Sequence, residues 1–311
     1  MQAIGIDLGG TNLRIALVAI EGSTARVIEE QRCAVANREP QDVAAVIAET
    51  VDQLNGVTKH DPVGIGIAGM LDITGRVMAN SPNLGWRNVP FMQLVEQATA
   101  RKVVMENDLG AIAWAEHRFG AGRGFANMVC VFIGTGVGGG AVLDGRPYRG
   151  GSNASMEIGH VRVVPGGNLC GCGAHGCLEA YVGGAFLTKL ARQNASDTVR
   201  ALVDGDLDKL HAGHVDEAAR AGDEYCRQII EQGAAFLGGV LGDLSVLFNP
   251  DVLVIGGTVW QGCSHLRDVT ARVFGELGPA PARAHVKLVQ AELPENAGVV
   301  GAADLARMSA Q

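Results

Sequence analysis

Basic residues are scarce in this sequence. Its 311 residues include 25 Lys and Arg against 33 Asp and Glu, which gives a net charge of −8. Nucleic-acid binding by counterion release needs Lys and Arg clustered on one face of a protein. The balance therefore argues against a nucleic-acid partner, and we expect small-molecule ligands.

Long apolar runs and an export signal are also missing. Apolar runs such as 252–255 are the size of a strand and end at glycine, whereas a membrane span needs about 20 residues. Residues 1–7 enter a strand pattern directly, without a basic segment followed by an apolar one. We expect a soluble, cytoplasmic protein with no membrane partner.

The cysteines do not form a disulfide pattern. Their number, seven, is odd, and only those at 170, 172 and 177 lie close together. A tight group of thiols in a reducing compartment binds metal more often than it forms disulfides. We interpret the scattered ones as small buried apolar residues, namely Cys33, Cys130, Cys226 and Cys263.

What the sequence does contain is apolar residues in alternating strand and helix patterns. A hydrophobic content of 47% supports a large core, and single cores stop growing near this chain length, so we expect two domains. The alternation predicts an α/β fold. Helical patterns cover 40–55, 109–119, 224–248 and 298–311, and strand patterns cover 4–18, 63–67, 103–105, 129–143, 252–255 and 285–289.

The strand-turn-strand pattern of 4–18 recurs at 129–143, so we interpret the two halves as duplicated hairpins. The glycine-rich segment 120–124 is the expected boundary. It gives a smaller α/β domain at 1–120 and a larger one at 121–297, with the terminal helix 298–311 packing back on the first.

The first hairpin has the features of a phosphate-binding turn. Asp7 ends a strand and is followed by Gly9, Gly10 and Thr11. Glycine lacks the Cβ that would keep phosphate oxygens from backbone N–H groups. We predict that this turn binds ATP phosphate and that Asp7 holds Mg²⁺ through water.

The second hairpin carries a glycine series that formally matches the dinucleotide-binding fingerprint. That motif requires a helix after the glycines, but Ala141-Val142-Leu143 continues as a strand. We therefore predict a second phosphate turn instead, formed by Gly134, Thr135, Gly136 and Gly138. No P-loop sequence is present.

A third glycine pair, Gly256-Gly257, follows the strand at 252–255. With the two hairpins across a cleft, it would hold the adenosine end of a triphosphate. This arrangement resembles the duplicated actin-like ATPase, or ribonuclease H-like, architecture of sugar kinases.

Three thiolates and one imidazole are close together in the sequence, at Cys170, Cys172, Cys177 and His160. This is the ligand set of a closed tetrahedral zinc site, and the intervening glycines allow the tight turns. His175 competes as a ligand, but His160 is favoured because it belongs to the segment Glu157-Ile158-Gly159-His160. Four protein ligands leave no position for water, so the Zn²⁺ is expected to be structural.

A zinc ion here would also fix the carboxylates around the loop. Glu157, His160 and Glu179 bracket the cysteines, and a fixed loop can hold them to accept hydrogen bonds from sugar hydroxyls.

Three motifs together are similar to those of the ROK family of bacterial sugar kinases and sugar-responsive repressors. They are Asp7-Leu8-Gly9-Gly10-Thr11, Glu157-Ile158-Gly159-His160 and Cys170-x-Cys172-Gly173-x-x-Gly176-Cys177-x-Glu179. The resemblance covers essentially the whole chain. It implies ATP-dependent transfer of phosphate to a hexose hydroxyl, expected at C6, in a homodimer or higher homo-oligomer. It places sugar contacts at Gly69, Asn83, Asn107, Asp108, Glu157, His160 and Glu179.

The resemblance makes Asp108, in Glu106-Asn107-Asp108, the catalytic base. Without the family pattern, its position between a strand and a helix fits a helix N-cap equally well. A carboxylate there can accept the proton of the attacking hydroxyl.

Three residues depart from the family pattern beside the expected sugar pocket. Gly110 and Ala68 stand where many members have Asn and Pro, and Met156 stands where they have Gly. The segment Pro82-Asn83-Leu84-Gly85-Trp86 resembles the glucose-phosphorylating members, which favours glucose as the substrate.

Other functions remain open at this point. A repressor of the same family would carry a helix-turn-helix domain ahead of Asp7, where the sequence offers no room. A kinase for N-acetylmannosamine, fructose or allose fits the same motifs. A non-catalytic, zinc-stabilised sugar-binding regulator would use every glycine and zinc feature for structure alone.

Overall fold

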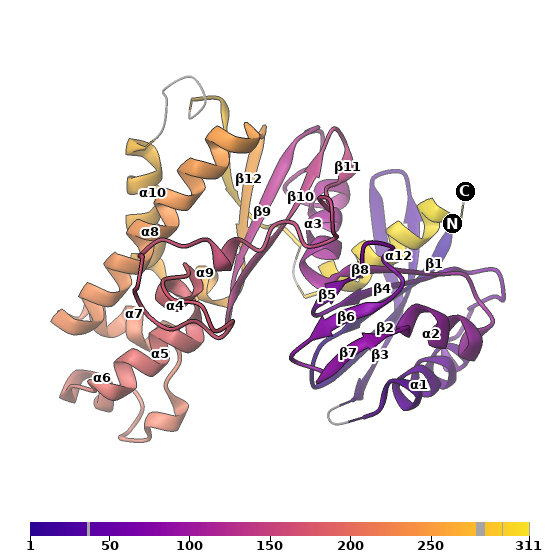
Figure 1. Ribbon diagram of the computed structural model, residues 1–311, viewed down its shortest axis with the longest axis horizontal. Coiled ribbons are helices and arrows are strands. Elements are labelled where there is room, and N and C mark those ends of the chain that lie inside the picture. Colours follow the sequence, from indigo (N-terminus) through magenta and orange to yellow (C-terminus); the bar gives the residue numbers. More distant parts are fainter. Residues whose placement is uncertain (36–37, 278–283, 294, 311) are drawn as a thin grey trace. The chain divides into compact units, whose positions relative to one another are not determined.

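The computed structural model describes residues 1–35, 38–277, 284–293 and 295–310, and structural statements below concern these residues. The chain forms two compact units (Figure 1). The first comprises Met1–Ala126, Gly140–Met156 and Ala291–Gln311, and the second comprises Asn127–Gly139 and Glu157–Gln290. Each unit is described by itself.

These limits differ from the single boundary expected at 120–124. Residues 121–126, 140–156 and 291–297 belong to the first unit. Hydrogen bonds explain two of these segments: Asn153 Nδ2 donates to the Asp72 carbonyl at 2.6 Å, and Leu293 N–H donates to Glu116 Oε1 at 2.8 Å. Such side-chain contacts cannot be read from a glycine-rich segment.

The first unit is built on a five-stranded sheet in the order β3-β2-β1-β4-β8. β1 pairs antiparallel with β2, and β2 pairs antiparallel with β3. β4 pairs parallel with both β1 and β8. The strands are β1 (Gln2–Leu8), β2 (Asn12–Glu21), β3 (Thr24–Ala34), β4 (Val63–Ile67) and β8 (Val103–Asn107).

A second five-stranded sheet has the order β11-β10-β9-β12-β13. β12 pairs parallel with β9 and β13, and β10 pairs antiparallel with β11. The strands are β9 (Met128–Ile133), β10 (Val137–Leu143), β11 (Arg146–Pro147), β12 (Val252–Gly256) and β13 (Lys287–Gln290). When the strands of each sheet are numbered in chain order, both sheets have the spatial order 3-2-1-4-5. The predicted duplication and α/β class are therefore confirmed.

The alternation of side chains along β1 divides the core of the first unit. Ile4, Ile6 and Leu8 join one apolar cluster with residues of α1 and α2, while Ala3 joins another with residues of α3 and α12. Figure 1 shows α1 beside α2, and α12 alongside β1 and β4. The helices are α1 (Pro40–Gln53), α2 (Phe91–Thr99), α3 (Asp108–Phe119) and α12 (Ala297–Ser309).

A small antiparallel sheet in the order β5-β6-β7 completes the first unit. It consists of β5 (Met70–Leu71), β6 (Met78–Ser81) and β7 (Trp86–Val89). Its last turn, between β6 and β7, carries Asn83.

Helices make up most of the second unit. The long helix α8 packs against α10 and α7 (Figure 1). The helices are α4 (Glu179–Val182), α5 (Gly184–Gln193), α6 (Asp197–Ala201), α7 (Ala212–Arg220), α8 (Glu224–Phe248), α9 (Thr258–Gly262) and α10 (Ser264–Glu276), with 3-10 turns at Ile158–His160 and Leu207–Lys209.

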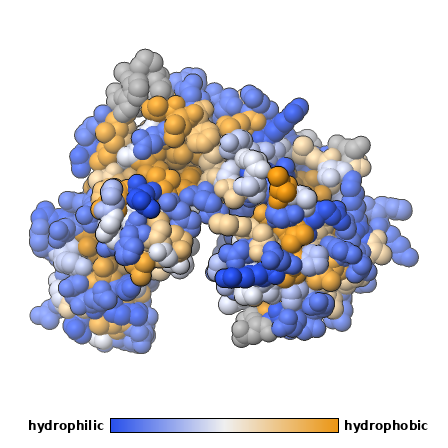
Figure 2. Space-filling model, viewed as in Figure 1, coloured by the Kyte–Doolittle hydropathy of each residue, from blue (hydrophilic) through white to orange (hydrophobic). Residues whose placement is uncertain are grey.

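One helix corrects the expectation that no apolar segment approaches the length of a membrane span. By length and composition alone, the 25-residue α8 could cross a membrane. Its most apolar window is 61% buried inside the protein, so we interpret it as a core helix. Figure 2 shows apolar residues gathered over the α8 and α10 region, where Val246, Leu247 and Leu277 are exposed.

Candidate active site

The first phosphate turn joins β1 to β2. Gly9 N–H donates to the Asn12 carbonyl at 3.0 Å, and Thr11 accepts a backbone hydrogen bond from Val35 at 3.0 Å. A Cβ on Gly10 would lie 2.6 Å from the Asn83 carbonyl oxygen. Only glycine lets this turn approach Asn83 so closely, and the structure thus brings two predicted site segments together.

Two carboxylates of the first unit have raised pKa values, and the charge of one contributes to the shift of the other. Asp7 is the next-to-last residue of β1, and Asp108 begins α3 directly after β8. Burial raises the pKa of Asp7, the negative charge of Asp108 raises it further, and the guanidinium of Arg14 opposes them. Burial also raises the pKa of Asp108, against the hydrogen bond from Leu109 N–H. Such a pair favours binding of a cation or a proton.

Asn107, not Asp108, caps helix α3. Asn107 Oδ1 accepts hydrogen bonds from Leu109 N–H at 3.0 Å and Gly110 N–H at 3.1 Å, and its Nδ2 donates to the Gly69 carbonyl at 3.1 Å. The alternative interpretation of Asp108 as an N-cap is therefore wrong. Asp108 Oδ1 also accepts the Leu109 N–H, at 2.9 Å, but the Asp108 carboxylate is not needed as the cap because Asn107 fills that role.

The second phosphate turn joins β9 to β10, and the strand after it confirms that the dinucleotide motif is absent here. Gly134 N–H donates to the Gly136 carbonyl at 3.0 Å, and Val137 N–H donates to Glu179 Oε2 at 2.9 Å. A Cβ on Gly136 would lie 2.5 Å from the same Glu179 oxygen. Glu179, at the start of α4, thus holds the turn in place, while Gly138 continues into β10.

The predicted metal ligands gather in one place. One ligand atom from each residue lies within 4.8 Å of all the others, in the group His160, Cys170, Cys172 and Cys177. Cys172 Sγ and Cys177 Sγ are 3.8 Å apart, and Cys170 Sγ is 3.7 Å from His160 Nδ1. For tetrahedral zinc with bonds of about 2.3 Å to sulfur, neighbouring sulfurs lie about 3.8 Å apart. The spacing and the donor set both fit Zn²⁺.

His175 lies outside this group. Its Nδ1 is 2.9 Å from the Gly167 carbonyl oxygen, so its ring is engaged elsewhere. The group of potential ligands in the structure contains His160, which the sequence segment favoured, and does not contain His175.

The metal-ligand group is connected to two carboxylates of the second unit. Cys170 Sγ lies 3.6 Å from Glu179 Oε1, and His160 Nε2 lies 3.9 Å from Glu157 Oε2. Since Nδ1 of His160 faces the cysteines, its Nε2 is directed to the Glu157 side. A metal ion bound at Nδ1 would thus orient the His160 ring and leave Nε2, the nitrogen next to Glu157, without a metal bond.

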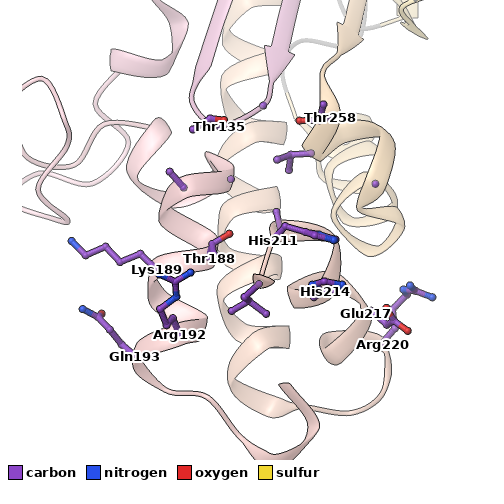
Figure 3. Close-up of a pocket in the computed structure, with 18 residues that line it drawn as sticks. Thr135, Thr188, Lys189, Arg192, Gln193, His211, His214, Glu217, Arg220 and Thr258 are labelled. Atoms are coloured by element: carbon purple, nitrogen blue, oxygen red, sulfur yellow. The ribbon is translucent and has the colours of Figure 1, made fainter. Parts of the chain in front are cut away.

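A cavity of about 920 Å³ opens in the second unit between α5 and α7. Figure 3 shows Thr135 and Thr258 at one end of it and Thr188 in the middle, opposite His211. The wall also includes Lys189, Arg192, Arg220 and Glu217. The hydroxyls and cations suit phosphate groups, and the volume suits a nucleotide.

The cavity wall on α7 presents aromatic rings. The imidazoles of His211 and His214 stack with their centroids 3.6 Å apart. Burial, with His211 next to it, lowers the pKa of His214. A stacked pair of imidazole rings offers a flat surface of the kind on which a purine base can stack.

Sequence reasoning found only part of this cavity. Gly134 and Thr135 line it, and Gly257 at φ +97° leads into Thr258, but Gly136, Gly138, Gly256 and Gly257 themselves do not line it. It missed residues that lie on helices, or directly before one, without any motif, namely Thr188, Lys189, Arg192, His211, His214 and Arg220. Helical patterns mark buried positions and give no signal for a polar cavity wall.

The predicted site residues are divided between the two units. The first contains Asp7, Gly9, Gly10, Thr11, Gly69, Asn83, Asn107 and Asp108. The second contains Gly134, Thr135, Gly136, Gly138, Glu157, His160, Cys170, Cys172, Cys177, Glu179, Gly256 and Gly257. Each group is assembled within its own unit.

Two residues that depart from the family pattern have distinct surroundings. Met156 adopts φ +62°, a left-handed conformation that favours glycine. Ala68 N–H donates to the Leu8 carbonyl at 3.1 Å, and its own carbonyl accepts from Ser81 Oγ at 2.6 Å.

The two matching sheets define an α/β protein of the actin-like, ribonuclease H-like class. The ROK family model matches residues 3–309. The chain belongs to the ROK family.

Relatives of known activity are similar over nearly the full chain. A glucokinase of Streptomyces coelicolor is 34% identical, with 98% of this chain and 97% of the relative covered. An N-acetylmannosamine kinase of Escherichia fergusonii is 30% identical, with 99% of both covered. The crystal structure of a ROK family glucokinase from Streptomyces griseus in complex with glucose and AMPPNP is 36% identical, with a TM-score of 0.81 over 99% of this chain and 100% of that one.

Proposed function

We propose that this protein is an ATP-dependent hexose kinase that converts glucose and ATP to glucose 6-phosphate and ADP. The observation that carries the proposal is the strand end of β8, where Asn107 caps the helix and burial raises the pKa of Asp108. The similarity to glucokinases over nearly the full chain supports the same activity.

Asp108 acts as the general base in this proposal. It accepts the proton of the attacking sugar hydroxyl as the hydroxyl oxygen bonds to the γ-phosphorus of ATP. The bond from that phosphorus to the bridging oxygen breaks, and ADP leaves. A carboxylate with a raised pKa is a stronger base, provided that it is ionised at the working pH.

In this proposal, each unit supplies its own candidate sugar-binding groups. In the first, Asn83, Asn107 and the backbone at Gly69 supply amide and carbonyl groups. In the second, sugar hydroxyls donate hydrogen bonds to the carboxylates of Glu157 and Glu179, and another hydroxyl hydrogen-bonds with Nε2 of His160. The support for this assignment is the hydrogen bond from Asn107 Nδ2 to the Gly69 carbonyl in the first unit and, in the second, the distance of 3.9 Å between His160 Nε2 and Glu157 Oε2.

ATP occupies the cavity next to Thr135 and Thr258 in this proposal. The second phosphate turn leads into that cavity. In the first unit, the backbone amides of Gly10 and Thr11 are the proposed phosphate donors, because that of Gly9 already donates to the Asn12 carbonyl. Asp7 would hold Mg²⁺ through water, and the ion would neutralise phosphate charge.

Zinc has a structural role in the proposal. Its four ligands would be His160, Cys170, Cys172 and Cys177, which leave no open coordination position. When bound, Zn²⁺ would fix the loop between Glu157 and Glu179. Burial raises the pKa of the Cys170 thiol to about 12, so binding requires the metal to displace that proton.

A kinase for an N-acetylhexosamine is the second candidate, supported by the 30% identity to an N-acetylmannosamine kinase.

We also propose a cytoplasmic location, because ATP and reduced thiols are both available there. The working form is proposed to be a homodimer or higher homo-oligomer.

Phosphorylation of a panel of sugars tests the proposal. Purified protein is assayed for ADP release with ATP, Mg²⁺ and each of glucose, mannose, fructose, allose, N-acetylglucosamine and N-acetylmannosamine. The proposal predicts the highest kcat/KM for glucose. Preference for N-acetylmannosamine would favour the second candidate, and no ADP release with any sugar would overturn kinase function.

A further inference from the structure

Glu106 directly precedes Asn107 and Asp108 in the chain, and both oxygens of its carboxylate accept hydrogen bonds. Glu106 is buried, with 10% of its side chain exposed. Its Oε1 accepts the Asn107 N–H at 3.1 Å, and its Oε2 is bound by both Nε and Nη2 of Arg149 at 2.6 Å. A buried carboxylate held by two nitrogens of one guanidinium has a defined position.

Helix α3 leaves room for this carboxylate. A Cβ on Gly110 would lie 3.1 Å from Glu106 Oε1 and 3.2 Å from its Cγ. Gly110 is one of the residues that depart from the family pattern. A side chain at this position would crowd Glu106. Gly110 therefore allows the Glu106 carboxylate to pack tightly against the first turn of α3.

Arg149 lies on a segment that is itself anchored to the first unit. Asn153 Nδ2 donates to the Asp72 carbonyl at 2.6 Å, which anchors the segment, and within the segment Ser155 Oγ donates to the Tyr148 carbonyl at 2.7 Å. The segment continues to Met156 and then to Glu157, the first residue of the second unit's main segment. Arg149 therefore ties the chain that leads to Glu157 to the strand end that carries Asp108.

We propose that Arg149 is a positioning residue for phosphoryl transfer, which acts through Glu106 to hold Asn107 and Asp108. This inference rests on the proposed kinase function. Arg149 does not contact the reacting atoms in this account. It fixes the carboxylate that binds the Asn107 N–H, and Asn107 in turn caps α3 and binds the Gly69 carbonyl.

Loss of the guanidinium would leave the Glu106 carboxylate buried without its counter-charge. Such a carboxylate turns toward water or rearranges its neighbours. Since Asn107 and Asp108 follow directly in the chain, their side chains would shift. Displacements of about 1 Å in a catalytic group, or loss of a residue that orients one, lower rates by about 10- to 100-fold.

Steady-state kinetics of four variants test this inference, with kcat referred to folded protein and melting temperature measured alongside. They are Arg149→Ala, Arg149→Lys, Glu106→Gln and the double variant Arg149→Ala with Glu106→Gln. Arg76→Ala is the matched control, because Arg76 forms a half-exposed ion pair with Glu96 at 2.8 Å in the same unit.

We expect Arg149→Ala to lower kcat about 10- to 100-fold while KM for ATP changes less than about twofold. Arg149→Lys should recover part of the loss, Arg76→Ala should retain wild-type kcat, and the double variant should be no slower than Arg149→Ala alone, because the two residues act as a unit.

A wild-type kcat in Arg149→Ala, with or without a lower melting temperature, would overturn the inference and leave the kinase function standing. Additive losses in the double variant would overturn it as well. If Arg149→Ala does not fold, Arg149→Lys and Glu106→Gln carry the same test through their kcat. A wild-type protein that phosphorylates no sugar would instead refute the proposed function.

Discussion

Glu179 accepts the backbone N–H of Val137 through Oε2 at 2.9 Å. Its other oxygen, Oε1, lies 3.6 Å from Cys170 Sγ. A single carboxylate thus connects the second phosphate turn to the group of metal ligands. A change in that group is expected to reach the turn, because Gly136 packs directly against the same carboxylate.

Substitution of Cys172 by Ala tests this connection. Removal of one ligand should lower the zinc content well below one ion per chain and lower the melting temperature by at least about 5 °C, since the loss of a structural metal is among the larger destabilising changes. The KM for the sugar should rise in the same variant. Metal analysis, calorimetry and kinetics measure the three effects. Cys33→Ala, outside the group, is the control, and full zinc content with normal stability in Cys172→Ala would refute the zinc site.

Asp108 is expected to lower the stability of the protein at neutral pH. Burial raises its pKa in the folded state, so the folded protein binds this proton more tightly than the unfolded chain does. Stability then falls as pH rises from the ordinary Asp pKa of about 3.9 to the raised value, and stays reduced above it.

Asp108→Asn should therefore have a higher melting temperature than the wild type at pH 7, and the difference should shrink as pH falls toward 4. The amide can still accept the Leu109 N–H bond that Oδ1 accepts now. Thermal melts of both proteins between pH 4 and pH 8 measure this. A lower melting temperature of the variant at pH 7 would contradict the account of the Asp108 environment.

The cavity between α5 and α7 offers a steric test of nucleotide binding. Thr188 faces His211 across it (Figure 3), so Thr188→Phe should fill the space and raise KM for ATP about tenfold or more, with little effect on KM for the sugar. Thr198→Phe, on exposed α6, is the control. An unchanged KM for ATP in Thr188→Phe would place the nucleotide elsewhere.

The backbone at Met156 allows a stability prediction. Its φ of +62° is unfavourable for a residue with a Cβ, by about 1 kcal/mol. Met156→Gly should relieve this strain, and the relief should offset the entropic cost of glycine's greater freedom in the unfolded chain. Met156→Ala keeps the strain. Denaturant unfolding should rank the glycine variant above the alanine variant. The opposite order would show that Met156 side-chain contacts outweigh backbone strain.

Much of the fold can be predicted from the sequence, because its two sheets leave a repeated pattern. The hairpins at 4–18 and 129–143, the helix at 224–248 and the glycine turns all carry local signals of apolar period and turn residues. The group of candidate metal ligands is predictable for the same reason, since Cys170, Cys172 and Cys177 are neighbours in the sequence.

The rest depends on contacts between distant residues. The pairing of Arg149 with Glu106 joins positions 43 residues apart in the chain, and no local pattern marks it. The alternative that Asp108 caps α3 stayed open in the sequence, because Asn and Asp both suit that position and only the Asn107 hydrogen bonds decide between them. The unit boundaries were missed for a similar reason: 140–156 is held in place by side chains of the first unit.

The central claim is that Asp108 is the base for phosphoryl transfer to glucose. The most direct measurement compares wild type and Asp108→Asn for glucose 6-phosphate formation, with glucose binding followed by calorimetry. The account predicts that kcat falls about 10²- to 10⁴-fold in the variant while glucose still binds. An Asp108→Asn protein that phosphorylates glucose at the wild-type rate would contradict it.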